Sequence, residues 1–176
     1  MAWLVALCMR RWLPLAVLLL AGCGASAPPI LTGAVDRDGI ERELPAWRDE
    51  LAHAEVDEAA AAALAEVPPG AHVDVFLGTW CGDSRRVVSR LFRALEQVPE
   101  AGRPFTIRFV AVDRQKRDPE GLVEGRDIRF VPTIIVTRDG AEVGRIVESA
   151  PGGVEVDLGR LLRGEATGTL SLRTDL

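Results

Sequence analysis

The chain has 176 residues, a length that fits one ordinary domain with extensions. Apolar residues make up 48% of it, enough for one hydrophobic core and too many for a disordered chain. The formal net charge is −5 and there is no basic stripe, so we expect no nucleic-acid partner. Lys116 is the only lysine, which we interpret as a compositional bias toward arginine rather than as phosphate recognition. His53 and His72 lie far apart and no cysteine–histidine cluster has zinc spacing, so we predict no metal site and no cofactor.

Residues 1–22 have the pattern of an export signal. An arginine pair precedes an apolar stretch, Leu13 to Leu20, and small residues follow it. This stretch is short for a membrane span. Its end, Leu20 to Cys23, resembles the lipobox of bacterial lipoproteins, in which the cysteine is lipidated and becomes the new N-terminus. We therefore predict a lipoprotein signal peptide and lipidation of Cys23. The alternative is an ordinary signal peptide or an uncut anchor helix.

Lipidation would fix both the location and the thiol count of the mature protein. Two acyl chains suffice for stable attachment. The predicted location is therefore the bacterial cell envelope, facing the periplasm or the exterior, and the outer membrane where the cell has two membranes. Cys8 would leave with the signal and Cys23 would be blocked. Cys81 would then be the only free thiol, and no internal disulfide could form.

The rest of the chain divides into a tether, a domain and a tail. Residues 23–44 are rich in proline and glycine with few large apolar side chains, so we predict a flexible tether. The predicted domain covers residues 45–166. It opens with Pro45, which suits the first turn of a helix, and an alanine-rich helical stretch follows as far as Pro68. Residues 167–176 are predicted to be a frayed tail.

The remaining pattern predicts an α/β fold. Apolar residues recur at spacings of three and four in the predicted helices, and β-branched or alternating apolar residues mark the strands. A polar connection is predicted from Asp113 to Gly125. In chain order the elements are Ala71–Leu77 (strand), Ser84–Val98 (helix), Phe105–Val112 (strand), Thr133–Thr137 (strand), Ala141–Val147 (strand) and Val154–Leu162 (helix). This order predicts a central mixed β-sheet flanked by helices on both faces.

Cys81 stands where the first of these strands turns into a helix. The first backbone N–H groups of a helix lack partners, and the helix dipole is positive at that end. Both effects stabilise a thiolate, and the thiolate is the nucleophilic form of cysteine. We therefore predict that Cys81 is a catalytic nucleophile.

Two motifs in this element order resemble the thioredoxin family over about residues 45–165. Trp80-Cys81-Gly82 lies at the strand–helix junction, and Val131-Pro132-Thr133 precedes the third strand. The resemblance implies a thioredoxin-like fold, with a cis peptide bond before Pro132 beside the reactive cysteine. It also implies that the backbone of Val131 pairs with an extended substrate chain, with Trp80, Gly82 and Asp83 completing the binding surface. The alternatives are another α/β domain with a chance Trp-Cys-Gly, and a Pro132 that simply starts a strand.

The chain departs from the family pattern at two positions. The family motif is Cys-x-x-Cys, but Ser84 stands in place of the second, resolving thiol. A serine hydroxyl ionises far too weakly to attack a mixed disulfide at a useful rate. The family often has a buried acid six residues before the reactive cysteine, where this chain has Val75. Asp74 is one residue away, so strand alternation points it to the other face of the sheet.

These departures predict a monothiol protein. The export signal places it outside the cytoplasm. Cys81 would form a mixed disulfide with a cysteine-containing protein or a small thiol, and an external thiol would release it. We expect a monomer held on the membrane through Cys23. The alternative is a redox-inactive module of thioredoxin fold that binds peptides or proteins. A cysteine-dependent peroxidase and a covalent dimer through Cys81 also remain open.

Overall fold

The computed structural model describes residues 27–176, so the predicted signal segment and Cys23, the predicted lipidation site, lie outside the described part. Among the described residues, none of the helices has the length and apolar character that a membrane crossing requires. The elements are β1 (Gly33–Val35), α1 (Arg37–Glu43), α2 (Pro45–His53), α3 (Glu58–Ala62), the 3-10 helix η1 (Ala63–Glu66), β2 (Ala71–Leu77), α4 (Gly82–Leu95), β3 (Phe105–Ala111), β4 (Thr133–Arg138), β5 (Ala141–Val147), α5 (Val154–Arg163) and β6 (Gly168–Leu170).

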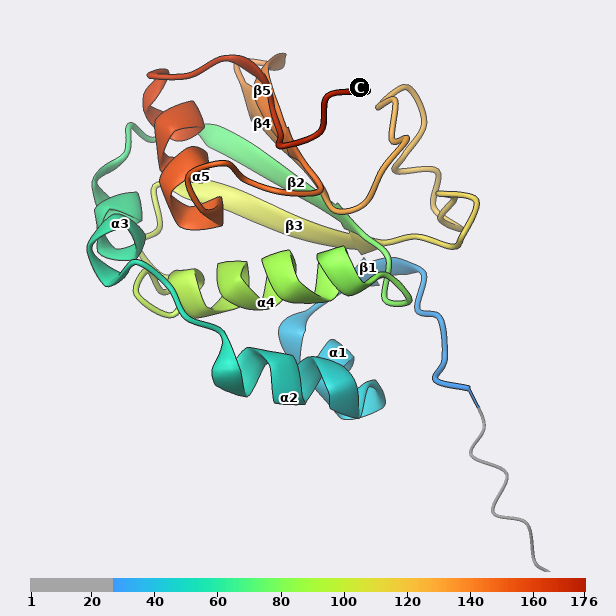
Figure 1. Ribbon diagram of the computed structural model, residues 1–176. Coiled ribbons are helices and arrows are strands. Elements are labelled where there is room, and N and C mark those ends of the chain that lie inside the picture. The colour runs from blue at the N-terminus through green and yellow to red at the C-terminus, as the bar shows by residue number, and fades with distance from the viewer. Residues whose placement is uncertain (1–26) are drawn as a thin grey trace, which may run out of the picture.

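One mixed sheet forms the centre of the structure, with strand order β1-β3-β2-β4-β5-β6 (Figure 1). β2 runs parallel to β3 and antiparallel to β4, and Val75 of β2 lies opposite Phe109 and Ile134. β4 and β5 form an antiparallel hairpin, and β6 pairs parallel with β5. The predicted α/β fold with a mixed sheet is thereby confirmed.

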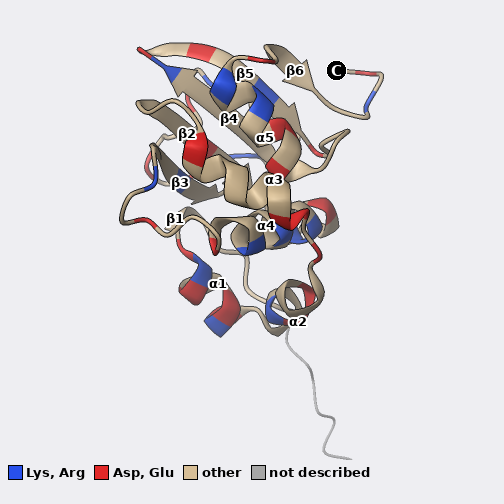
Figure 2. Cartoon of the chain, turned by 90° about the vertical axis from the view of Figure 1, so that its left-hand side faces the viewer, with Lys and Arg blue, Asp and Glu red and all other residues tan. Residues whose placement is uncertain are grey.

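The helices gather on one face of this sheet, as the two perpendicular views show (Figures 1 and 2). Strand alternation directs Val73, Val75 and Leu77 of β2 toward this face. They pack there with the apolar side of α4, which includes Leu91, and with α5, which includes Leu158. These side chains are fully buried, so the helix layer encloses the main core of the protein.

A loop covers the opposite face. The apolar cluster there consists of Phe76, Val110, Val112, Val131 and Ile135, with Trp80, Cys81, Leu122, Val123 and Ile128 packed against it. None of these residues belongs to a helix in the described part of the chain. The structure therefore differs from the prediction of helices on both faces. The reason is local, because the segment between β3 and β4 contains Pro119 and takes a left-handed backbone at Lys116, Gly121 and Gly125, which favours turns.

The predicted tether, residues 23–44, contains a strand and a helix in the part that the structure describes, residues 27–44. β1 pairs with β3, and Asp36 caps α1 by accepting a hydrogen bond from the Gly39 N–H at 2.7 Å. Ile40 is 1% exposed, so α1 is anchored in the main core. The sequence pattern missed β1 and α1 because elements of three and seven residues contain too few apolar positions to show a period.

At two further places the boundaries in the structure differ from the predicted ones. The single helical stretch predicted after Pro45 is divided, because Ala54 takes an extended conformation and Asp57 caps a new helix, α3. The predicted tail over 167–176 contains β6, and Ser171 donates a hydrogen bond from its hydroxyl to the Val147 carbonyl at 2.7 Å. Pairing with a partner strand, rather than local sequence, orders these residues.

Candidate functional site

Cys81 is the N-cap residue of α4. Its backbone is extended (φ −97°, ψ 127°), its N–H donates to the Gly78 carbonyl at 2.9 Å, and its carbonyl accepts from the Arg85 N–H at 3.0 Å. The side chain makes no capping hydrogen bond, and it is partly exposed. α4 has 14 residues, so Cys81 stands at the positive end of a long helix dipole.

The thiol of Cys81 faces the segment before β4. Its Sγ lies 3.3 Å from the carbonyl oxygen of Val131, to which the S–H donates. The Val131–Pro132 peptide bond is cis. Two hydrogen bonds fix this segment, from the Glu148 N–H to the Pro132 carbonyl (2.7 Å) and from the Thr133 hydroxyl to the Phe130 carbonyl (2.8 Å). The two predicted motifs, 50 residues apart in sequence, thus meet in the fold.

Ser84 is fully buried and makes a structural contact. Its hydroxyl oxygen accepts a hydrogen bond from the Gly78 N–H at 3.0 Å, which closes the turn that carries Cys81. The same turn is held through Thr79, whose carbonyl accepts from the Trp47 indole at 3.1 Å and whose hydroxyl accepts from the Leu31 N–H at 3.0 Å. No sequence pattern predicted these contacts of Trp47 and Leu31, because both residues come from segments far from the turn.

Trp80 packs beside the thiol turn. Its indole N–H donates to the Val112 carbonyl at 3.1 Å. A Cβ atom on Gly78 would lie 2.8 Å from the indole ring, so only glycine allows the ring to pack here. Two cations lie over the ring, with the Arg114 guanidinium carbon 5.1 Å and the Lys116 ammonium 5.9 Å from its centroid. The predicted binding surface therefore has a cationic border that the sequence motifs did not indicate.

Gly82 and Asp83, the other predicted binding residues, are exposed on the first turn of α4. The Asp83 carboxylate pairs with Arg86 at 2.6 Å. Arg85, two residues after Asp83 in the chain, pairs instead with Glu50 of α2 at 3.3 Å. One arginine therefore offsets the negative charge beside the thiol, and the other ties α4 to α2.

Asp74 lies on the loop-covered face, as strand alternation predicted, while Val75 packs against the helices. The Asp74 side chain is fully buried, and three basic side chains contact it. These are Arg108 of β3 at 2.7 Å, Arg126 of the covering loop at 3.1 Å and His72 of β2 at 2.9 Å. No sequence pattern predicted this network, because its members come from three segments.

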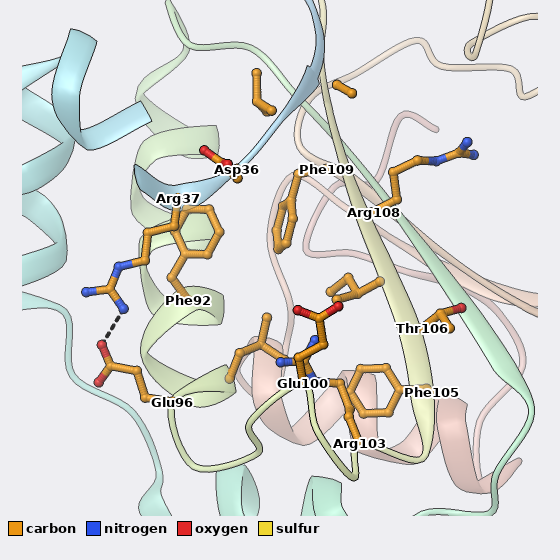
Figure 3. Close-up of a pocket in the computed structure, with 14 residues that line it drawn as sticks. Asp36, Arg37, Phe92, Glu96, Glu100, Arg103, Phe105, Thr106, Arg108 and Phe109 are labelled. Atoms are coloured by element: carbon orange, nitrogen blue, oxygen red, sulfur yellow. Dashed lines mark hydrogen bonds and ion pairs between the residues drawn. The ribbon is translucent and has the colours of Figure 1, made fainter. Parts of the chain in front are cut away.

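A groove of about 670 Å³ lies where β1 ends beside β3 and α4 (Figure 3). Phe92 and Phe109, whose ring centroids are 4.8 Å apart, contribute to its lining, and Arg37 and Glu96 form an ion pair at 2.5 Å on one side. None of the predicted site residues lines this groove. Among residues 27–176, no group of three or more His, Cys, Asp or Glu side chains is arranged to hold a metal ion.

Comparisons with known proteins support the fold and a thioredoxin-like family. No family model matches the chain. The thioredoxin-like protein of Acanthamoeba polyphaga mimivirus is 27% identical over 93 residues, which are 53% of this chain and 64% of the relative. The chain thus spans less than two thirds of that relative's length. A solved structure of a protein of unknown function from Pseudomonas aeruginosa superposes with a TM-score of 0.56 at 15% identity, covering 76% of this chain and 94% of the other.

Proposed function

We propose that this protein carries out thiol–disulfide exchange through Cys81 as a monothiol. The observation that carries the proposal is the placement of the Cys81 thiol, which is partly exposed at the N-terminus of α4 and 3.3 Å from the Val131 carbonyl. The unpaired N–H groups of the helix start would stabilise the thiolate. The similarity to a thioredoxin-like protein supports thiol chemistry in general.

The proposed exchange needs a substrate disulfide and one resolving thiol besides Cys81. The Cys81 thiolate attacks one sulfur of a substrate disulfide, a new S–S bond forms, and the second substrate sulfur leaves as a thiolate that takes up a proton. An external thiol, from the substrate or a small molecule, then attacks the mixed disulfide as its thiolate. The products are a new disulfide and the regenerated Cys81 thiolate, so Cys81 undergoes no net redox change. Ser84 cannot perform this second step, because it has no thiol and its hydroxyl is bonded to Gly78.

The substrate chain is proposed to lie along Val131. Once the Cys81 sulfur is in a mixed disulfide it no longer donates to the Val131 carbonyl, which can then accept an N–H from an extended peptide. Trp80, Gly82 and Asp83 border the same surface, beside Pro132. The proposed partners are cysteine-containing proteins or small thiols, and the protein is expected to act as a monomer.

The test measures the reaction of Cys81 with an uncharged chromophoric disulfide, using the full chain with Cys8→Ser and Cys23→Ser. We expect faster reaction than that of an unstructured peptide containing Trp-Cys-Gly, and no reaction after Cys81→Ser. A Ser84→Cys variant should release its trapped partner without added thiol, since it supplies an internal resolving group. A rate no faster than that of the peptide would overturn the proposal.

A redox-inactive binding module is the second candidate. The observation that favours it is that Cys81 is the only cysteine in the described part of the chain and that its S–H is already engaged by Val131. In that case peptide capture would survive Cys81→Ser, and the chromophoric disulfide would react no faster with the protein than with the peptide.

The proposal includes attachment to the cell envelope through Cys23. What supports it is the Leu20 to Cys23 pattern after an arginine pair and an apolar stretch. In a bacterial host the protein is expected in the membrane fraction, extractable only with detergent, and Cys23→Ser should release it. Equal membrane association of the two forms would contradict lipidation.

A further inference from the structure

Two cations beside the turn that carries Cys81 lack a carboxylate partner in the described part of the chain. No carboxylate among residues 27–176 lies within 4.0 Å of the charged nitrogens of Arg114 or Lys116, although both side chains lie over the Trp80 ring. The other arginines around the turn are paired. These pairs are Arg85–Glu50, Arg86–Asp83 and Arg117–Asp113. The charge of Arg114 and Lys116 is therefore available to a molecule that approaches Cys81.

The loop that carries these cations has a fixed shape. The Asp113 N–H donates to the Arg117 carbonyl at 2.9 Å, and the Lys116 N–H donates to the Asp113 carbonyl at 3.0 Å. The Asp113 carboxylate accepts from the N–H groups of Gln115 (2.8 Å) and Arg117 (2.9 Å). Lys116 itself has a φ of 59°, in the left-handed region. The hydrogen bonds of Asp113 thus hold the loop in shape, while the side chains of Arg114 and Lys116 lie over Trp80.

Trp80 connects the cations to the reactive position. It precedes Cys81 directly, and the hydrogen bond from its indole to Val112 holds the ring at the base of the same loop. The attraction between a cation and the face of an indole ring keeps the Arg114 and Lys116 charges close to it. The cations therefore border the path of any chain that docks beside the Cys81 sulfur.

The sign of this border is opposite to that of the whole protein. The chain carries a net charge of −5, so its general field repels anions, and attraction near Cys81 has to come from local groups. We propose that Arg114 and Lys116 select acidic substrates, namely peptide or protein disulfides with Asp or Glu next to the reacting cysteine. This inference rests on the proposed exchange at Cys81 and assigns its substrate class.

The first test compares three peptide disulfides that differ only in two residues flanking the cysteine, which are both Asp, both Asn or both Lys. For the full chain with Cys8→Ser and Cys23→Ser, we expect Cys81 to react on the order of ten-fold faster with the Asp peptide than with the Lys peptide at low ionic strength. The ratio should fall in 0.5 M salt, because exposed charges are screened.

The discriminating variant is Arg114→Gln with Lys116→Gln, which should bring the ratio of the two rates close to one. A matched control, Arg160→Gln with Arg163→Gln, removes the same net charge from the C-terminal turn of α5. That turn lies at the opposite end of β2, since Arg138 donates to the Leu162 carbonyl and stands opposite Ala71. This control should keep the preference.

The outcomes separate the two proposals. If the uncharged disulfide reacts rapidly but the Asp and Lys peptides react equally, or if the Gln variant keeps the preference, the inference about Arg114 and Lys116 is overturned and the exchange function stands. If the uncharged disulfide does not react faster than a free peptide thiol, the exchange function itself fails.

The second test does not depend on the reactivity of Cys81. Lys116 is the only lysine of the chain, so a carbodiimide that joins amines to carboxylates has one side-chain amine available. In the Cys81→Ser chain we expect the Asp peptide to couple at Lys116, mapped by mass spectrometry, and the Arg114→Gln substitution to reduce this coupling. Coupling to the chain's terminal amine but not to Lys116 would overturn the inference.

Discussion

Each face of the sheet buries carboxylate side chains, and the surroundings of Glu155 on one face differ from those of Asp74 on the other. Glu155 of α5 lies in the helix layer, where Arg90 of α4 donates to both of its oxygens (2.8 and 2.5 Å) and the Asp57 N–H of α3 donates at 2.8 Å. Asp74 of β2 lies under the covering loop with Arg108, Arg126 and His72. Both carboxylates are fully buried. One joins three helices to each other, and the other joins two strands to a loop.

The two faces also differ in the size of their apolar clusters and in what covers them. The helix layer holds a large continuous apolar core, and its buried charge serves to lock the helices. The loop-covered face holds a smaller apolar cluster that includes Trp80 and Cys81. Its cover consists of turns that carry exposed cations. Functional residues commonly lie on loops held by a rigid scaffold, and here the helix layer is that scaffold.

The largest effect on stability is expected from the carboxylate under the loop. Asp74→Asn removes the charge that Arg108 and Arg126 share, and the free energy of unfolding should fall by about 1–3 kcal/mol, less than for a fully buried pair because the arginines reach solvent. Urea denaturation at pH 7 measures it. Asp139→Asn, the same change in an exposed hairpin turn, should stay within about 0.5 kcal/mol of wild type. Equal effects of the two variants would mean that Asp74 does not hold the loop.

A smaller, pH-dependent effect is expected from the carboxylate in the helix layer. Burial alone would raise the pKa of Glu155, but hydrogen bonds from Arg90 and from the Asp57 N–H outweigh burial and lower the pKa below its ordinary value of 4.5. The stabilisation is therefore complete above about pH 4.5 and is lost as the pH falls through the lower value of the folded protein.

Urea denaturation of Glu155→Gln and wild type at several pH values checks this sign. The variant should be less stable at pH 7, and the gap between the two proteins should narrow below pH 4.5, because only wild type loses the ionised pair. Glu66→Gln, at an exposed position of η1, serves as the matched control and should follow the wild-type curve. A gap that stays constant down to acid pH would contradict the lowered pKa.

Local patterns were enough to find the reactive turn. The apolar run before Gly78 and the apolar period after Cys81 predicted a strand, a turn and a helix. The structure has α4 over Gly82–Leu95, where the pattern predicted a helix over Ser84–Val98. Local patterns also explain why short elements were missed. β1 and β6 have three residues each, which is too few to show a period. They exist because β3 and β5 offer strand edges to pair with.

The surroundings of the turn could not be found in this way. Ser84 was interpreted only as a missing thiol, but its hydroxyl holds the Gly78 N–H inside the core. The contact of Thr79 with Trp47 joins residues 32 positions apart, and neither residue type marks such a pair. Arg114 and Lys116 looked like members of a polar connection until the loop placed them over Trp80.

The sequence alone determined the longer strands and helices of the domain and the identity of the candidate nucleophile, because periodicity and the start of a helix are properties of neighbouring residues. Only the tertiary structure decided that helices cover one face of the sheet and a loop the other. It also decided that the Cys81 thiol faces the Val131 carbonyl and which charges near it remain unpaired. These features depend on contacts between segments tens of residues apart, and such contacts leave no periodic trace in the chain.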